Sequence, residues 1–244
     1  MLVAVFLGCT TPSADDSADP VLPVSVRVTL ANVSVPGALD TSNGAADAVL
    51  APGVIVVHDG QTRLFEEGQL AGEGMERVAE DGDPAVLVAE LQGRDGVVSI
   101  DYLSAVDDAT YEAAPMYSGE LGYEVIDAPQ GAVVEVVFMF AQSNDIFGAT
   151  IAPIAVADLE AAPASGPLGG EGELDLTPRL AWFDAGTEAN EEPGVGGDQA
   201  PRQVGPDVGT STSDPIARID GQDAAGWTMP PLADVARLSV SREP

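Results

Sequence analysis

Apolar and polar residues alternate along several stretches of the chain. From Val24 to Leu30 the even-numbered positions are apolar and the odd-numbered positions are polar, which is typical of a β-strand with one buried face. Short apolar runs and further alternation predict additional strands at residues 53–60, 97–106, 131–142, 179–183, 216–220 and 235–241. The run 131–142 is apolar on both faces, so we expect it in the middle of the core.

One stretch has helical spacing instead. Residues 73–93 combine good helix formers with apolar residues at helical intervals, and the segment from Asp81 to Pro84 interrupts them. We therefore expect two short helices there. Strands separated by Gly/Pro turns, with helices only in this inserted region, predict an all-β fold, an antiparallel β-sandwich. Residues 161–178 have the composition of a loop, and the strands predicted on both sides argue against a domain boundary.

Length and composition agree with this fold class. A chain of 244 residues is long enough for one sizeable core, and we expect one main domain over residues 23–244. Hydrophobic residues make up 45% of the chain but aromatic residues only 5%, because alanine and valine supply the excess. This composition favours a β-rich fold over a coiled coil or a membrane bundle.

The formal net charge of −31 limits the kinds of partner. All nine basic residues are arginine, and lysine is absent. Such a field repels phosphate backbones, so we expect no DNA or RNA partner, and it attracts metal cations and basic partners. Most of the charge also has a simpler explanation, which is that it keeps the protein soluble.

The first residues resemble the end of a bacterial lipoprotein signal. An apolar stretch leads to Gly8-Cys9 and passes at once into a tether rich in Thr, Ser, Asp and Pro. In such signals the cysteine after a small residue is lipidated. We interpret residues 1–22 as a lipoprotein-type signal and tether, with Cys9 as the lipidation site, and a start placed too far downstream would explain the missing basic residues. The alternatives are a plain secretory signal and an incidental apolar N-terminus.

Few residues offer hydrolytic chemistry. His58 is the only histidine, and Cys9 is the only cysteine, so a Cys/His nucleophile pair is excluded. A set that uses His58 and Asp59 is conceivable, but the chain has no G-x-S-x-G nucleophile elbow and no P-loop or dinucleotide fingerprint. A histidine at the end of an apolar strand is more often a hydrogen-bonded structural residue, and this is the interpretation that we favour.

A loop rich in glycine and proline, residues 182–203, holds an unusual density of carboxylates. They are Asp184, Glu188, Glu191, Glu192 and Asp198, and Arg202 is the one residue of opposite charge. Like charges at close range repel and raise each other's pKa, so these groups either face water or surround a cation. Calcium takes six to eight oxygen ligands and tolerates irregular loops. The spacing does not fit an EF-hand, and a solvated acidic loop is the alternative.

Segments spread over the chain resemble the spondin N-terminal domain family, which is known from secreted matrix proteins of animals and from bacterial envelope proteins. They are "VRVTLANVS" at Arg27, "LAPGVIVVHDG" at Leu50, "LFEEGQLAGEGMERVAEDGDPAVLVAEL" at Leu64, "QSNDIFGA" at Gln142, "WFDAGTEANEEPG" at Trp182, "QAPRQVGPDVGT" at Gln199 and "DAAGWTMPPLADVARLSVS" at Asp223. They keep the same order and cover nearly everything after the tether.

The resemblance implies a β-sandwich similar to C2 domains and a bound calcium ion. In the family the ion is held by an aspartate of one segment and two aspartates of another. "SNDIF" places Asp145 at the first position, and "WFDAGTE" places Asp184 and Glu188 at the other two. Glutamate in place of aspartate lengthens the last ligand by one methylene and keeps its charge.

Taken together, the sequence predicts a calcium-binding adhesion or ligand-binding module that is not an enzyme. We expect it to be secreted and anchored to the bacterial cell envelope as a lipoprotein, with no contact to the membrane except through the lipid. Its ligand would be a protein or a glycan at the cell surface. Two alternatives remain open, a carboxylate-dependent hydrolase on the same sandwich and a purely structural envelope protein.

Overall fold

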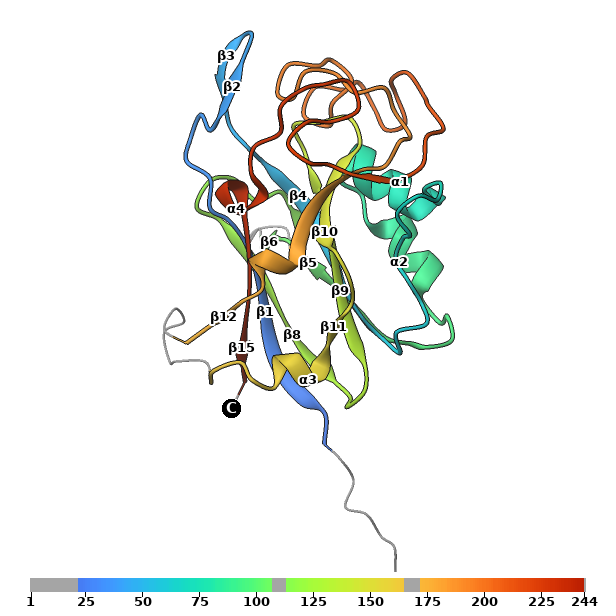
Figure 1. Cartoon of the computed structure of the whole chain (residues 1–244), viewed down its shortest axis with the longest axis vertical. Coiled ribbons are helices and arrows are strands. Elements are labelled where there is room, and N and C mark those ends of the chain that lie inside the picture. The colour runs from blue at the N-terminus through green and yellow to red at the C-terminus, as the bar shows by residue number, and fades with distance from the viewer. Residues whose placement is uncertain (1–21, 107–112, 165–171, 244) are drawn as a thin grey trace, which may run out of the picture.

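The structure, a computed structural model, is an antiparallel β-sandwich and describes residues 22–106, 113–164 and 172–243 (Figure 1). One sheet has the order β12 (Leu174–Asp175), β15 (Ala236–Arg242), β1 (Val24–Asn32), β8 (Leu121–Ala128). The other has the order β14 (Ala217–Arg218), β13 (Leu180–Asp184), β10 (Ile146–Thr150), β9 (Val133–Phe140), β4 (Leu50–His58), β5 (Val97–Leu103), and β11 (Ile154–Ala155) also pairs with β9. The predicted all-β sandwich is confirmed. Cys9 lies outside the described residues, as does nearly all of the predicted leader.

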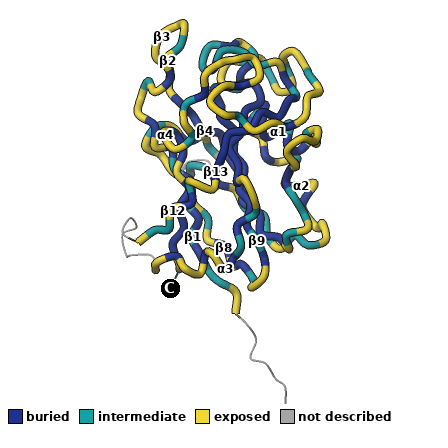
Figure 2. The backbone as a smooth tube through the Cα atoms, viewed as in Figure 1, coloured by how far each residue is buried: buried dark blue, intermediate teal, exposed yellow. Residues whose placement is uncertain are grey.

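The main core lies between the two sheets. Val26 and Val28 of β1 belong to the same buried cluster as Ile55 of β4 and Phe138 of β9, and Figure 2 shows the central strands buried along their length. Strand β9 also contributes Val137 to a second cluster on the other side of its sheet. The prediction that this strand is apolar on both faces and central is therefore confirmed.

The two short helices predicted within residues 73–93 are present, and they cover the outer face of the larger sheet. They are α1 (Glu73–Asp81) and α2 (Ala85–Leu91), and Met75 and Val78 of α1 pack in the second cluster. Gly82 ends α1 with φ of 63°, a left-handed conformation that favours glycine. A Cβ at Gly82 would also lie 2.5 Å from the Cβ of Ala51, so the close approach of helix and sheet requires glycine.

Several elements differ from the sequence-based expectation. Strands β8 and β10 were not predicted, nor was the hairpin of β2 (Leu39–Thr41) and β3 (Gly44–Ala46). Single-turn helices α3 (Val156–Leu159) and α4 (Leu232–Val235) lie outside the inserted region, so the expectation that helices are confined to it is wrong. The remaining short elements are β6 (Ala105–Val106), β7 (Ala113–Ala114) and the 3-10 turn η1 (Thr177–Arg179). The loop predicted at 161–178 contains β12 and part of η1.

A long connection between β13 and β14 covers one end of the sandwich. Figure 1 shows these orange and red loops above the ends of β10 and α1. Residues 185–216 contain turns and one isolated bridge, between Glu188 and Ser211. None of the described helices is long and apolar enough to cross a membrane.

Candidate metal centre

Asp145 lies where β10 begins, at the end of the sandwich that the long connection covers. The antiparallel register pairs Ile146 with Asp184, so Asp145 lies beside the residue that follows β13, and its carbonyl oxygen accepts the N–H of Ala185 at 3.1 Å. The Asp145 side chain is fully buried. Its Oδ2 accepts the backbone N–H groups of Thr187 and Glu188 at 2.8 Å and 3.1 Å, but its Oδ1 has no hydrogen-bond partner among the described residues.

Glu188 follows directly in this connection and is also buried. The Asn144 amide donates to its Oε2 at 3.3 Å. Its carboxylate lies so close to the returning chain that a Cβ at Gly209 would be 2.7 Å from Oε1. The loop therefore folds back over Glu188, and glycine at position 209 makes room for the carboxylate.

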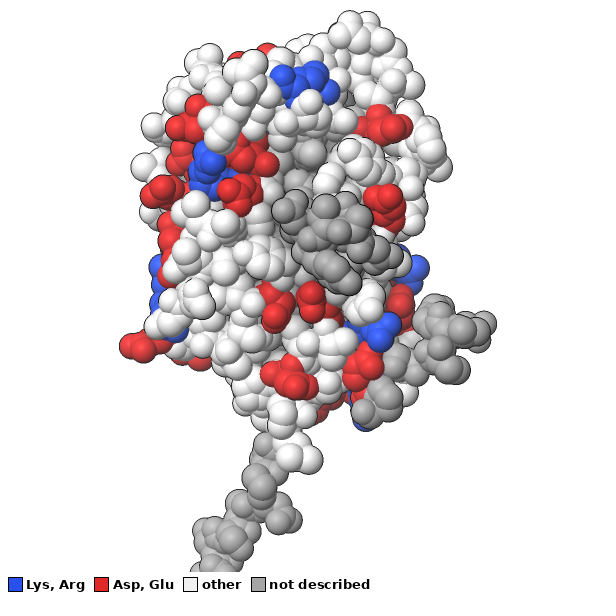
Figure 3. All heavy atoms as spheres, turned by 180° about the vertical axis from the view of Figure 1, so that it is seen from behind, with Lys and Arg blue, Asp and Glu red and all other residues white. Residues whose placement is uncertain are grey.

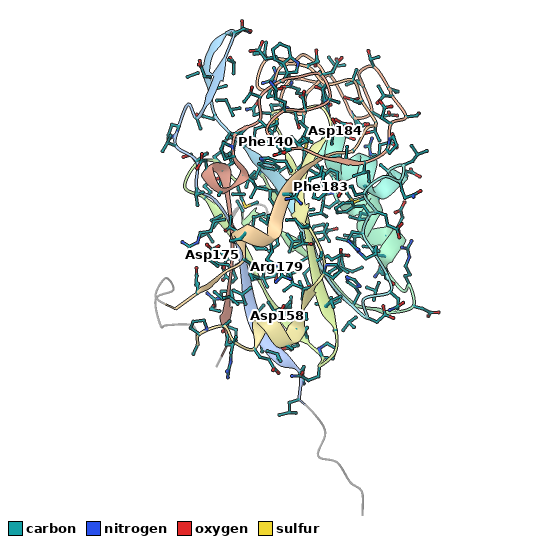
Figure 4. All side chains as sticks on the ribbon, viewed as in Figure 1. Phe140, Asp158, Asp175, Arg179, Phe183 and Asp184 are labelled. Carbon is teal, nitrogen blue, oxygen red and sulfur yellow. The ribbon has the colours of Figure 1, made fainter. Side chains whose placement is uncertain are left out.

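Asp184 is held differently from the other two predicted ligands. Strand alternation puts it on the face of β13 that carries Trp182 in the core between the sheets, whereas Phe183 packs in the cluster under the helices. Figure 4 shows Asp184 at the end of β13, beneath the loops. Its Oδ1 accepts the N–H of Gly186 at 2.8 Å and its Oδ2 accepts the Asn190 amide at 2.6 Å. Both of its oxygens already have donors from its own loop.

Glu80 of α1 is a buried carboxylate at the site that the sequence analysis missed. It is 2% exposed, and its Oε2 has no hydrogen-bond partner. Desolvation raises its pKa to about 7, a hydrogen bond with Thr187 lowers it, and the charges of Glu76, Asp81 and Asp145 raise it. The only signal in the sequence is that Glu80 follows the apolar pair Val78-Ala79 on an amphipathic helix.

The carboxylates destabilise one another's charged forms. Desolvation raises the pKa of Glu188 to about 8, and the charge of Glu80 contributes next. Desolvation likewise raises the pKa of Asp145 to about 7, and the charge of Asp184 contributes next. No ion pair between described residues includes Glu80, Asp145 or Glu188. Burial without a counter-ion favours either a proton or a metal cation at this place.

The tightest acidic group among the described residues is Glu76, Glu80 and Asp207. One carboxylate oxygen from each lies within 4.8 Å of the others, so this triad could hold a metal ion. It was not predicted, because Asp207 lies more than a hundred residues from α1 in the sequence. Figure 3, which views the molecule from behind, shows acidic side chains gathered on the side where the helices lie.

The other acids of the loop have structural contacts. Glu191 accepts the N–H of Asp198 at 3.0 Å, and Glu192 accepts the Ser42 N–H at 2.6 Å, which joins the loop to the β2–β3 turn. Arg202 donates to the carbonyl of Gly196 at 2.7 Å. These contacts hold the loop around the buried carboxylates. None of them provides a hydrogen bond to Oδ1 of Asp145 or to Oε2 of Glu80.

An open groove of about 570 Å³ lies on the other side of this loop. Its apolar lining includes Trp227, Met229, Pro230 and Pro231, and its carboxylates are Asp40, Glu192 and Asp234. Trp227 is 41% exposed. No described residue that lines the groove carries a positive charge.

His58 lies away from these sites, in a buried network at the end of β4. Its Nε2 is 3.1 Å from Oε2 of Glu135, and Arg63 lies 2.9 Å from Oε1 of the same carboxylate. The N–H of Gly60 donates to Nδ1 at 3.1 Å, whereas Nε2 lies at ion-pair distance from Glu135 without making a hydrogen bond to a described residue. These contacts are those of a structural residue.

The chain matches no protein-family model and no curated protein. The resemblance to the spondin N-terminal domain family therefore stays a prediction.

Proposed function

We propose that this chain is a calcium-binding module of the spondin N-terminal type that acts in adhesion or ligand binding, and not in catalysis. The observation that carries the proposal is the Asp145 carboxylate. One of its oxygens is held by two backbone N–H groups and the other has no partner, although the residue is fully buried. An oriented buried carboxylate with a free oxygen is what a cation ligand requires.

Asp145, Glu188 and Asp184 would hold the ion. Calcium suits this set because it accepts carboxylate and carbonyl oxygens in irregular geometry. Glu188 needs little change, since its one amide donor is at 3.3 Å. Asp184 would join by exchanging the Asn190 amide for the ion. A divalent cation would remove the repulsion that raises the pKa values of Asp145 and Glu188.

The groove beside Trp227 is our proposed ligand surface. An exposed indole offers a face for stacking, and the carboxylates at the groove complement a positively charged group. Glu192 lines the groove and also belongs to the loop that covers Asp145. An ion that orders the loop would therefore also fix the side of the groove that Glu192 forms. The favoured partner is a protein that presents arginine or lysine, on an envelope to which Cys9 anchors the chain.

Thermal unfolding with calcium tests the proposal. Protein freed of metal by a chelator should gain a higher melting temperature in millimolar calcium, because the ion binds the folded state and scarcely the unfolded one. Magnesium should raise it less, since it demands octahedral geometry and keeps its water. An unchanged melting temperature in both salts would overturn the calcium site.

A further inference from the structure

We infer that the chain has a second cation site, in which Glu76, Glu80 and Asp207 bind a calcium ion between helix α1 and the loop of residues 199–209. The site uses none of the three residues of the proposed calcium site. The ligands of the two sites are different residues, so either site can fail without the other.

The spacing of the triad fits a single ion. Calcium binds oxygen at about 2.4 Å, so two ligand oxygens on opposite sides of the ion are about 4.8 Å apart. The three carboxylate oxygens of the triad lie within 4.8 Å of one another. Even at this upper limit a common centre lies about 2.8 Å from all three oxygens, so small side-chain rotations would bring them to calcium-binding distance, and the positions of Glu76 and Asp207, which are not buried, leave room for water ligands.

The charges of the helix do not balance these carboxylates. Glu76 and Glu80 are four residues apart on one face of α1, where like charges repel. Glu80 is also one residue from the C-terminal end of α1, where the helix dipole disfavours a negative charge. The arginine of this helix, Arg77, pairs with Asp81 at 2.8 Å, and no ion pair between described residues includes a member of the triad.

Glu80 provides the independent observation that points to a ligand. Its side chain is 2% exposed and its Oε2 has no hydrogen-bond partner. The nearby donor is the Thr187 hydroxyl, which also lies 3.3 Å from Oδ2 of Asp145. One hydroxyl proton cannot serve both carboxylates, and a buried carboxylate without a partner is costly. A cation at the triad supplies the missing partner.

The loop is held in the position that such an ion needs. The Gln203 amide donates to Oδ1 of Asp81 at 2.7 Å, and the N–H of Asp207 approaches the same oxygen at 3.3 Å. Asp207 is the one described residue other than glycine with a positive φ, at 54°, a conformation that aspartate tolerates better than most residues. The ion would thus link α1 to the same connection that covers Asp145 and Glu188.

Equilibrium dialysis of the full chain at pH 8 with radioactive calcium tests the inference. We expect two ions per wild-type chain at millimolar free calcium, one for the double variant Glu76→Gln/Asp207→Asn, and one for Asp145→Asn. The matched control is Glu73→Gln, which removes an exposed charge from the same helix and should keep two ions. A double variant that binds as many ions as the wild type overturns the second site, whatever Asp145→Asn does.

Hydrogen exchange of the loop separates the two proposals. Calcium should slow amide exchange in residues 203–209 at least tenfold in the wild type and in Asp145→Asn, but not in the double variant. If Asp145→Asn keeps its full complement of ions while the double variant loses one, the proposed function fails and the second site stands. If calcium leaves exchange in this segment unchanged in the wild type, the link between α1 and the loop is wrong.

Discussion

Asp145 accepts the backbone N–H of Glu188 at 3.1 Å through Oδ2, while its Oδ1, in the fully buried part of the same side chain, has no hydrogen-bond partner. The contact joins the start of β10 to the loop after β13 and brings two carboxylates together. Removal of the charge at Asp145 should therefore affect calcium binding and the loop at once.

Asp145→Asn should lose the stabilisation that calcium provides at the site of Asp145, Asp184 and Glu188. In the wild type, calcium at 100 times its dissociation constant should raise the free energy of unfolding by about 2.7 kcal/mol. Asp184→Asn should lose most of this gain as well if Asp184 exchanges its Asn190 contact for the ion. Chemical unfolding with and without calcium measures the difference. Asp198→Asn, whose backbone contacts Glu191, is the control and should keep the gain.

Without calcium, stability should fall as the pH rises. The folded-state pKa of Glu80 is about 7 against 4.5 for the ordinary group, and that of Glu188 is about 8. Between the ordinary pKa of 4.5 and the raised folded-state pKa, the folded protein binds more protons than the unfolded chain. The free energy of unfolding therefore decreases with increasing pH in this range. Melting temperatures in chelator should therefore drop from pH 5 to pH 8. Glu80→Gln should flatten this dependence, and a slope equal to that of Glu73→Gln would contradict the role of Glu80.

Gly82→Ala should destabilise the protein more than Gly68→Ala. Both glycines have positive φ, at 63° and 85°, but a Cβ would meet Ala51 at 2.5 Å only at position 82, since position 68 has open space. The left-handed backbone alone costs about 1–2 kcal/mol, and overpacking adds about 1–3 kcal/mol. Urea unfolding measures the loss of unfolding free energy in each variant, and the difference between the two losses is the cost of the contact with Ala51. Equal losses would show that α1 can move away from the sheet.

Lipidation of Cys9 predicts a membrane-bound product. Expressed in bacteria with a complete signal, the wild type should partition into detergent, because lipoproteins carry more than one acyl chain and a single chain gives only marginal anchoring. Cys9→Ala should remain as an uncleaved precursor. Mass spectrometry of the purified protein checks both expectations, and unmodified mature wild type in the soluble fraction would contradict the assignment.

The proposal that the chain does not act in catalysis is tested through His58. His58→Ala should lower the free energy of unfolding, because it leaves the buried Glu135 with Arg63 as its partner. A panel of ester, peptide and glycoside substrates should show no turnover with the wild type. Turnover that His58→Ala or Glu188→Gln removes would instead favour the hydrolase alternative.

The sequence determined the fold class and most of the core. Alternation in β1 and the two-sided apolar run of β9 show directly which faces of these strands are buried. Gly82 marked the end of α1 because the left-handed conformation there favours glycine. Strand β8 was missed because Tyr123 and Val125 are apolar residues on its exposed face, which hides the alternation. Alternation therefore reveals a half-buried strand only where its solvent side is polar.

The sequence also brought forward Asp145, Asp184 and Glu188 as candidate ligands, through family resemblance and the acidic loop. It did not indicate Glu80 or Asp207. The chain has 40 acidic residues, and the neighbouring sequence does not distinguish a buried carboxylate from an exposed one. Tertiary structure decided that Glu80 would lose its water and face Asp207 from a distant loop. Burial and through-space charge depend on which segments meet, and that is set by the packing of the whole sandwich.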